Sequence, residues 1–199
     1  MGVTQLDEWF TELMHALDHQ SVFINKGDDP VFFLVYPPAE SLRVYQLLPE
    51  WIGKLKYRGW VPHVFNVGLA LVEYIRAHAD YETLSDFARD NPEELEQVNE
   101  SVSDMLRKSD DSTVVEDMVA EQIATASANA KGLLILTGVE LLHPYLQIGR
   151  IEQRLQGRFT VPTIVLYPGT RTSTFGLRFL GFYPPDGNYR SRHFGGTYA

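Results

Sequence analysis

The chain contains no cysteine, and this absence excludes disulfide bonds, thiolate metal sites and a cysteine nucleophile. It also lacks any run of the roughly 18 apolar residues that a membrane-spanning helix requires. Its first residues, Met1 to Glu8, carry neither the basic nor the apolar segment of a secretory signal. On these grounds we expect a cytoplasmic protein without a membrane partner.

The sequence motifs of nucleotide-binding and hydrolytic enzymes are missing as well. Neither Gly-x-x-x-x-Gly-Lys nor Gly-x-Gly-x-x-Gly occurs, and no Gly-x-Ser-x-Gly elbow is present. Glu140 follows a predicted strand, but no second carboxylate or lysine stands near it in the sequence. We therefore expect no catalytic residue, no metal ion and no cofactor.

Apolar patterns predict an α/β domain with a mostly parallel sheet. Strands are predicted at 31–36, 61–67, 131–138 and 160–166. The first and third are continuous apolar runs, which are typical of strands buried on both faces. A fifth, antiparallel strand is expected at an edge, over 177–183. The chain thus predicts a single domain over 1–199, with four to five strands in a Rossmann-like or P-loop-like three-layer core that lacks a Walker motif.

Helical spacing of apolar residues is found before the first predicted strand and between the later ones. It predicts helices over 6–17, 42–55 and 69–78, and another that follows Pro144. Crossover helices join parallel strands, so we expect the first two strands to form a parallel pair. Pro49 is expected to kink its helix or to begin a second segment, because proline lacks an N–H and crowds the preceding turn.

The net charge of −9 is unevenly spread. Residues 80–121 carry fourteen acids against three basic residues, whereas residues 143–199 carry seven arginines against two acids. The acidic stretch has sparse apolar positions and no strand signal. It predicts two or three helices, broken near 91–92 and 110–112, as an insertion over 80–129. The last residues, 188–199, are expected to lie over the surface.

Ligands of open parallel sheets bind at the carboxyl ends of the strands, so the turns there are the candidate sites. Tyr36-Pro37-Pro38 is a poor phosphate site, since two of its residues lack an N–H donor. Tyr167-Pro168-Gly169 is expected to stop the fourth strand, and Gly169 permits close approach of a backbone. Arg171 can bind a carboxylate or phosphate; the alternative is a solvated arginine beside a Pro-Gly turn.

Three blocks of the sequence resemble the BrxB family of BREX bacteriophage-exclusion systems. The blocks are Phe33–Pro38 with Leu42-Arg43 and Leu48-Pro49, then Leu134–Val139 with Pro144, and then Val161–Gly169 with Asn188-Tyr189-Arg190. The resemblance implies antiviral defence in the cytoplasm and no established catalytic activity. It also implies association with other BREX subunits, above all PglZ, an alkaline-phosphatase-like protein.

The turns and the family blocks together define the candidate partner-binding positions. These are Tyr36, Pro37, Pro38, Thr137, Gly138, Tyr167, Gly169, Arg171, Tyr189 and Arg190. We expect a non-catalytic adaptor that acts through protein–protein contact. Two alternatives stay open: a degenerate nucleotide-binding domain, and an accessory subunit that touches DNA weakly or indirectly. The residues for DNA contact would be Arg171, Arg178, Arg190 and Arg192.

Overall fold

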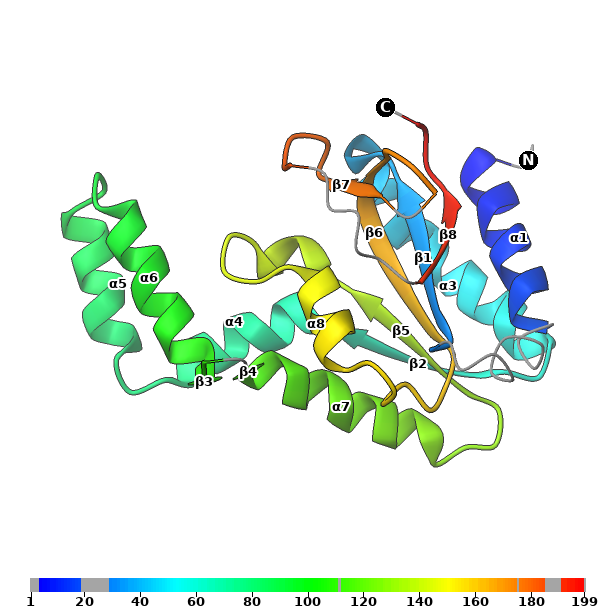
Figure 1. Ribbon diagram of the computed structural model, residues 1–199, viewed down its shortest axis with the longest axis horizontal. Coiled ribbons are helices and arrows are strands. Elements are labelled where there is room, and N and C mark those ends of the chain that lie inside the picture. Colours follow the sequence, from blue (N-terminus) through cyan, green and yellow to red (C-terminus); the bar gives the residue numbers. More distant parts are fainter. Residues whose placement is uncertain (1–3, 19–28, 111, 175, 185–190, 199) are drawn as a thin grey trace.

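The computed structural model describes residues 4–18, 29–110, 112–174, 176–184 and 191–198, and its centre is a mostly parallel sheet (Figure 1). The strand order is β2-β5-β6-β1-β8, and all neighbours in this row are parallel. The antiparallel β7 pairs with the end of β6. The strands are β1 (Val31–Tyr36), β2 (Val61–Asn66), β5 (Gly132–Thr137), β6 (Thr163–Arg171), β7 (Leu177–Phe179) and β8 (Arg192–Gly195). The predicted α/β class with a mostly parallel sheet is confirmed.

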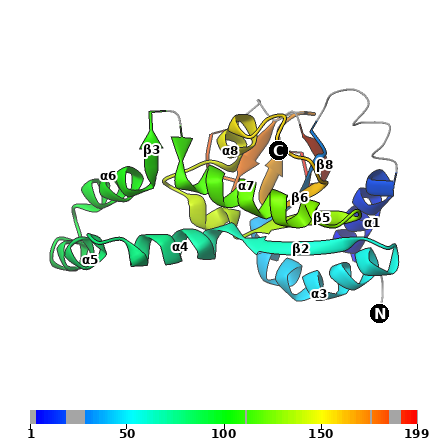
Figure 2. The same cartoon turned by 90° about the horizontal axis from the view of Figure 1, so that it is seen from below.

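Helices cover both faces of the sheet. One face carries α1 (Gln5–Asp18) and α3 (Ser41–Tyr57), and the other carries α4 (Val67–Ala77), α7 (Val114–Ser127) and α8 (Ile148–Arg154). Figure 2 shows α3 and α7 on opposite sides of β2. Side chains of a strand alternate between faces, so Phe32 and Leu34 pack with α1 and α3 while Phe33 and Val35 pack under α7 and α8.

The acidic helices project away from the sheet at the end of α4 (Figure 1). They are α5 (Tyr81–Asp90) and α6 (Leu95–Leu106), broken where the sequence predicts. At the second break, however, β3 (Arg107–Ser109) and β4 (Ser112–Thr113) form a short antiparallel hairpin. The expectation of a stretch without strands is therefore wrong. Of the predicted insertion, α7 packs on the sheet through Val119 and Ile123, and Val102 and Leu106 of α6 join the same core.

The turn expected to stop the fourth strand lies inside it. β6 continues through Pro168, which pairs with Tyr36 of β1, to Gly169, which pairs with Phe179 of β7. Proline cannot donate to a ladder, but the Pro168 carbonyl still accepts a hydrogen bond from the Leu180 N–H at 3.0 Å. The change of partner from β1 to β7 thus lets the strand extend past the proline.

Three further expectations need correction. Residues 192–195 do not lie loosely over the surface, because β8 completes the sheet beside β1. The helix around Pro49 is one element, α3, so the proline does not begin a second segment. β1 and β2 are parallel but not paired, since β5 and β6 lie between them.

A partly buried carboxylate, Asp7, links α1 to α3. Asp7 accepts hydrogen bonds from the Thr4 hydroxyl at 2.7 Å, the Trp51 indole N–H at 3.0 Å and the Lys54 ammonium at 3.3 Å. Burial alone would raise the pKa of Asp7, but these hydrogen bonds and the Lys54 charge outweigh it and lower the pKa from 3.8 to about 2. The charged form of Asp7 is therefore the one that the fold favours.

Low pH should remove the stabilisation that the charged Asp7 gives to the folded state. A carboxyl whose folded pKa is depressed stabilises the fold above its unfolded pKa, and the stabilisation is lost as pH falls through the folded value. We expect Asp7→Asn to lower the free energy of unfolding by about 1 kcal/mol at pH 7. The difference in unfolding free energy between the variant and the wild type should disappear between pH 4 and pH 2. Urea unfolding of both proteins at several pH values measures this. A difference in unfolding free energy that stays constant down to pH 2 would contradict this prediction.

Candidate functional site

A small polar cluster lies at the carboxyl ends of β1 and β5. Tyr36 ends β1, and Tyr45 reaches over from α3. The Tyr45 hydroxyl donates to Glu140 Oε1 at 2.8 Å and accepts from the Gly138 N–H at 3.2 Å. Glu140 belongs to the short 3-10 helix η2 (Val139–Leu142), which directly follows β5. We call Tyr36, Tyr45, Gly138 and Glu140 the strand-end cluster.

Burial dominates the electrostatics of this cluster. It raises the pKa of Tyr36 and of Tyr45 far above the ordinary value, and the nearby Glu140 raises both further. Both phenols therefore stay neutral at any physiological pH and can serve as hydrogen-bond donors. Glu140 Oε2 is buried and has no hydrogen-bond partner within the described ranges. The cluster presents acceptor character and would repel an anion such as a phosphate.

Close backbone packing leaves no space between the ends of β2 and β5. Gly138 has a left-handed φ of 72°, and a Cβ there would lie 2.1 Å from Asn66 Oδ1. Asn66 in turn caps α4 by accepting from the Leu69 N–H at 2.9 Å. A Cβ on Gly68 would meet the Gly138 carbonyl at 2.4 Å. Glycine is thus required at both positions for the close packing of these two strand ends.

Three exposed leucines lie near residues of the strand-end cluster or of the neighbouring end of β2 along the chain. Leu42 lies on α3 one turn before Tyr45, Leu141 follows Glu140, and Leu69 lies in the first turn of α4 beside Asn66. Their exposed fractions are 71%, 44% and 54%, respectively. We call these residues the leucine patch. Exposed apolar side chains that lie near one another are typical of protein contact surfaces.

The remaining predicted positions do not converge on this cluster. Tyr167 is buried and packs edge-on against Phe33 and Phe179, with ring centroids 5.5 and 5.2 Å apart. Gly169 lies in the β6–β7 ladder. Thr137 is buried at the end of β5. Pro37 lines a cleft of about 300 Å³ beside α1. Pro38 begins a short 3-10 helix.

Arg171 contacts the C-terminal strand. Its Nη1 donates to the Gly195 carbonyl at 3.5 Å, its guanidinium lies 4.9 Å from the Tyr198 ring centre, and its backbone N–H donates to the Thr197 carbonyl at 3.0 Å. The arginine expected to bind a carboxylate or phosphate thus holds residues 195–198 against β6. Tyr189 and Arg190 lie outside the described residues.

Sequence reasoning missed Tyr45. Its position in the apolar stripe of α3 suggested a core residue, and nothing in the sequence pairs it with Glu140, 95 residues away. A weak signal was available, because a buried tyrosine usually finds a partner for its hydroxyl. Titratable residues elsewhere do not add a metal site: no group of three or more His, Asp or Glu residues is arranged to hold a metal ion within the part of the chain that the structure describes.

The fold and the strand-end cluster define a class, the parallel α/β domains without a phosphate-binding loop. The family model described as BREX protein BrxB matches residues 64–194, from within β2 to within β8. Because this match covers more than half of the chain, the chain belongs to the BrxB family. It is thus a component of a BREX phage-defence system.

Other comparisons add no relative. No curated protein and no solved structure matches the chain. Among the described residues, none of the helices has both the length and the apolar character that crossing a membrane requires.

Proposed function

We propose that this BrxB protein is a non-catalytic adaptor that acts through protein–protein contact, with PglZ as its first partner. The observation that carries the proposal is the strand-end cluster beneath the leucine patch. In parallel α/β enzymes the ends of the strands hold the substrate or cofactor. Here Asn66, Tyr45 and Glu140 occupy the ends of β2 and β5, and the leucines next to them in the chain are exposed.

Two physical arguments favour contact over catalysis at this place. The tyrosines have pKa values raised by burial, so neither is suited to act as a base near neutral pH. The leucines, by contrast, are exposed and gain by association, since burying a fully exposed leucine contributes about 2 kcal/mol. A partner that covers the leucine patch would obtain several kcal/mol without ordering any new element of this chain.

Affinity measurements with purified PglZ from the same operon test the proposal. We expect the two proteins to co-elute in gel filtration, and Leu42→Ser and Leu141→Ser each to weaken binding about tenfold in calorimetry. The matched control is Tyr57→Ser, because Tyr57 is 94% exposed at the opposite end of α3 from Leu42. That control should change the affinity by less than about twofold.

Other results would contradict the proposal. Absence of binding to PglZ and to each of the other BREX subunits would remove the adaptor role. Calorimetric heats with ATP, GTP or NAD that depend on the strand-end cluster would favour a degenerate nucleotide-binding domain. Binding of duplex DNA with a steep salt dependence would favour the DNA-contacting alternative.

A further inference from the structure

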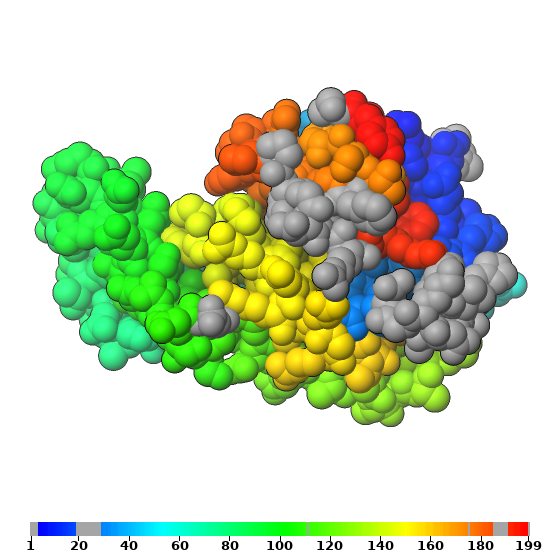
Figure 3. Space-filling view, viewed as in Figure 1, coloured from blue at the N-terminus to red at the C-terminus, as the bar shows by residue number. Residues whose placement is uncertain are grey.

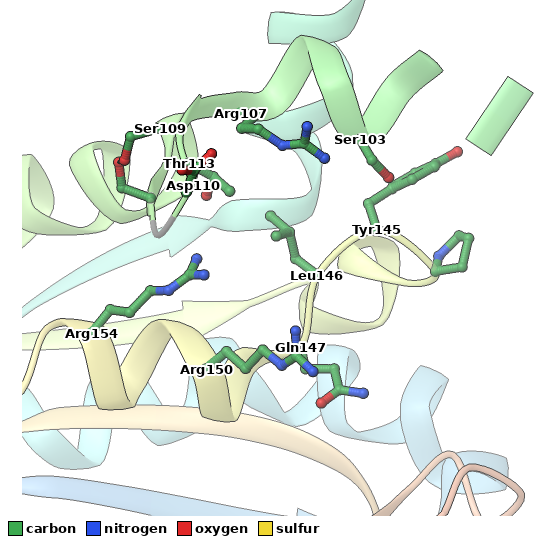
Figure 4. Close-up of a pocket in the computed structure, with 12 residues that line it drawn as sticks. Ser103, Arg107, Ser109, Asp110, Thr113, Tyr145, Leu146, Gln147, Arg150 and Arg154 are labelled. Atoms are coloured by element: carbon green, nitrogen blue, oxygen red, sulfur yellow. The ribbon is translucent and has the colours of Figure 1, made fainter. Parts of the chain in front are cut away.

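A groove separates the acidic helices from the body of the domain. Figure 3 shows these helices as a lobe at the left, beside the segment that holds α8. A cleft of about 350 Å³ lies where they meet. One wall comes from α6 and the β3–β4 hairpin and includes Arg107 and Thr113; the other includes Tyr145, Arg150 and Arg154 (Figure 4).

A second cleft continues the first along α6. It has a volume of about 380 Å³ and shares Ser103, Arg107, Pro144 and Tyr145 with the first. Its further lining includes the carboxylates of Glu96, Glu100 and Asp104. The two clefts thus form one elongated groove. The first half has three arginines, Arg107, Arg150 and Arg154, against one acid, Asp110, and the second has three acids against Arg107. None of the residues of the leucine patch lines it.

The charges in the groove are only partly neutralised. In the arginine half, Arg154 pairs with the buried Glu116 at 2.8 Å and Arg107 pairs with Asp104 at 3.1 Å. Arg150 is exposed and forms no ion pair with any described residue. In the acidic half, Glu96 and Glu100 are also exposed and form no ion pair with any described residue. The lining of the first half is therefore mainly basic, with Arg150 available to a partner, and that of the second half is mainly acidic, with Glu96 and Glu100 available.

We propose that this groove binds an extended segment of a partner protein that carries an acidic side chain over Arg150 and a basic side chain over Glu96 and Glu100. The inference rests on the proposed adaptor role and names the chemistry of the segment that is recognised. Arginine binds carboxylates through two parallel hydrogen bonds, which gives direction as well as attraction. Complementary charge of both signs also fixes the register of the segment in the groove.

The charge pattern argues against a nucleic acid as the occupant. A phosphate backbone is negative along its whole length, so the half lined by Glu96, Glu100 and Asp104 would repel it. A free inorganic anion would use the arginine half alone and would leave the acidic half without a role. A protein segment of mixed charge is the occupant that uses both halves.

Charge reversal in each half tests the inference with purified PglZ. Arg150 and Glu100 are exposed, and neither side chain forms a hydrogen bond or ion pair with another described residue, so Arg150→Glu and Glu100→Lys should both remain folded. We expect each to weaken binding about tenfold and to reduce its salt dependence. The matched controls are Arg158→Glu, just after α8, and Glu82→Lys on α5, both exposed and outside the groove. These should change the affinity less than about twofold.

The outcomes separate this inference from the adaptor proposal. If the wild-type chain binds PglZ and all four variants bind equally well, the groove inference is overturned and the adaptor role stands. If the wild type binds no BREX subunit, both fail together. Binding of inorganic phosphate or duplex DNA that Arg150→Glu abolishes, with PglZ binding unchanged, would also overturn the inference, because the groove would then hold an anion.

Discussion

Replacing Glu116 with alanine is expected to lower the free energy of unfolding by about 3 kcal/mol. The Glu116 side chain is 6% exposed, and its Oε1 accepts from Arg154 Nη1 at 2.8 Å. Its Oε2 accepts from the Thr113 N–H at 2.7 Å and from the Thr113 hydroxyl, which completes a capping box at the start of α7. The change leaves Arg154 without its partner and a helix end without its cap.

Urea unfolding at pH 7 measures the effect, and Asp117→Ala provides the control. Asp117 is the next residue, pairs with Lys108 at the surface and is 59% exposed, so its loss should cost less than about 1 kcal/mol. Arg154→Met should also destabilise the fold, because it leaves the buried carboxylate unpaired. The double change Glu116→Leu with Arg154→Met should cost less than the two single changes together. A Glu116→Ala cost no larger than that of Asp117→Ala would show that the pair contributes little.

Gly169→Ala is the second change with a large expected effect, about 3 kcal/mol of unfolding free energy. An added Cβ would lie 2.4 Å from the Arg178 carbonyl oxygen of β7 and 2.7 Å from Cε1 of Tyr167. The first contact is with backbone in a paired strand, so neither side can move without breaking the β6–β7 ladder. β7 and the aromatic cluster of Tyr167 and Phe179 should both be disturbed.

The control for this change is Gly53→Ala, in the middle of α3. A Cβ at Gly53 meets nothing within 4 Å, and alanine is the better helix former by about 1 kcal/mol. The two glycine-to-alanine changes should therefore have opposite signs in thermal and urea unfolding. Equal effects would mean that the close approach at Gly169 relaxes without cost.

The strands that could be predicted are those whose own sequence requires burial. Residues 31–36 and 132–137 are continuous apolar runs, and both are buried along their whole length. β8 has the sequence Arg-His-Phe-Gly, which carries no such pattern. It is a strand because β1 offers a free edge, a fact that depends on the strand order. β3 and β4 are three and two polar residues, held together by their own pairing and not by an apolar face.

The candidate site was predictable in part for the same reason. The position of Tyr36 and Gly138 at the strand ends follows from strand prediction and the parallel class. The role of Tyr45 depends on a contact with Glu140 across 95 residues. The partner of Arg171 likewise depends on a strand that the sequence does not predict. For β1 and β5 the local sequence predicts the residues that end the strand, whereas the end of β6 and the contacts of all these side chains depend on the tertiary fold.

The placement of β1 has a consequence for synthesis of the chain on the ribosome. β1 is the first strand to be made, yet Val31 pairs with Thr163 and Phe32 with Arg192. At typical translation rates, β6 and β8 are synthesised on the order of ten seconds after β1. During that time the partner strands of β1 do not exist, so Phe32, Phe33 and Leu34 stay exposed, although each is almost fully buried in the folded protein. The nascent chain thus exposes an aggregation-prone segment until nearly all of the domain has been translated.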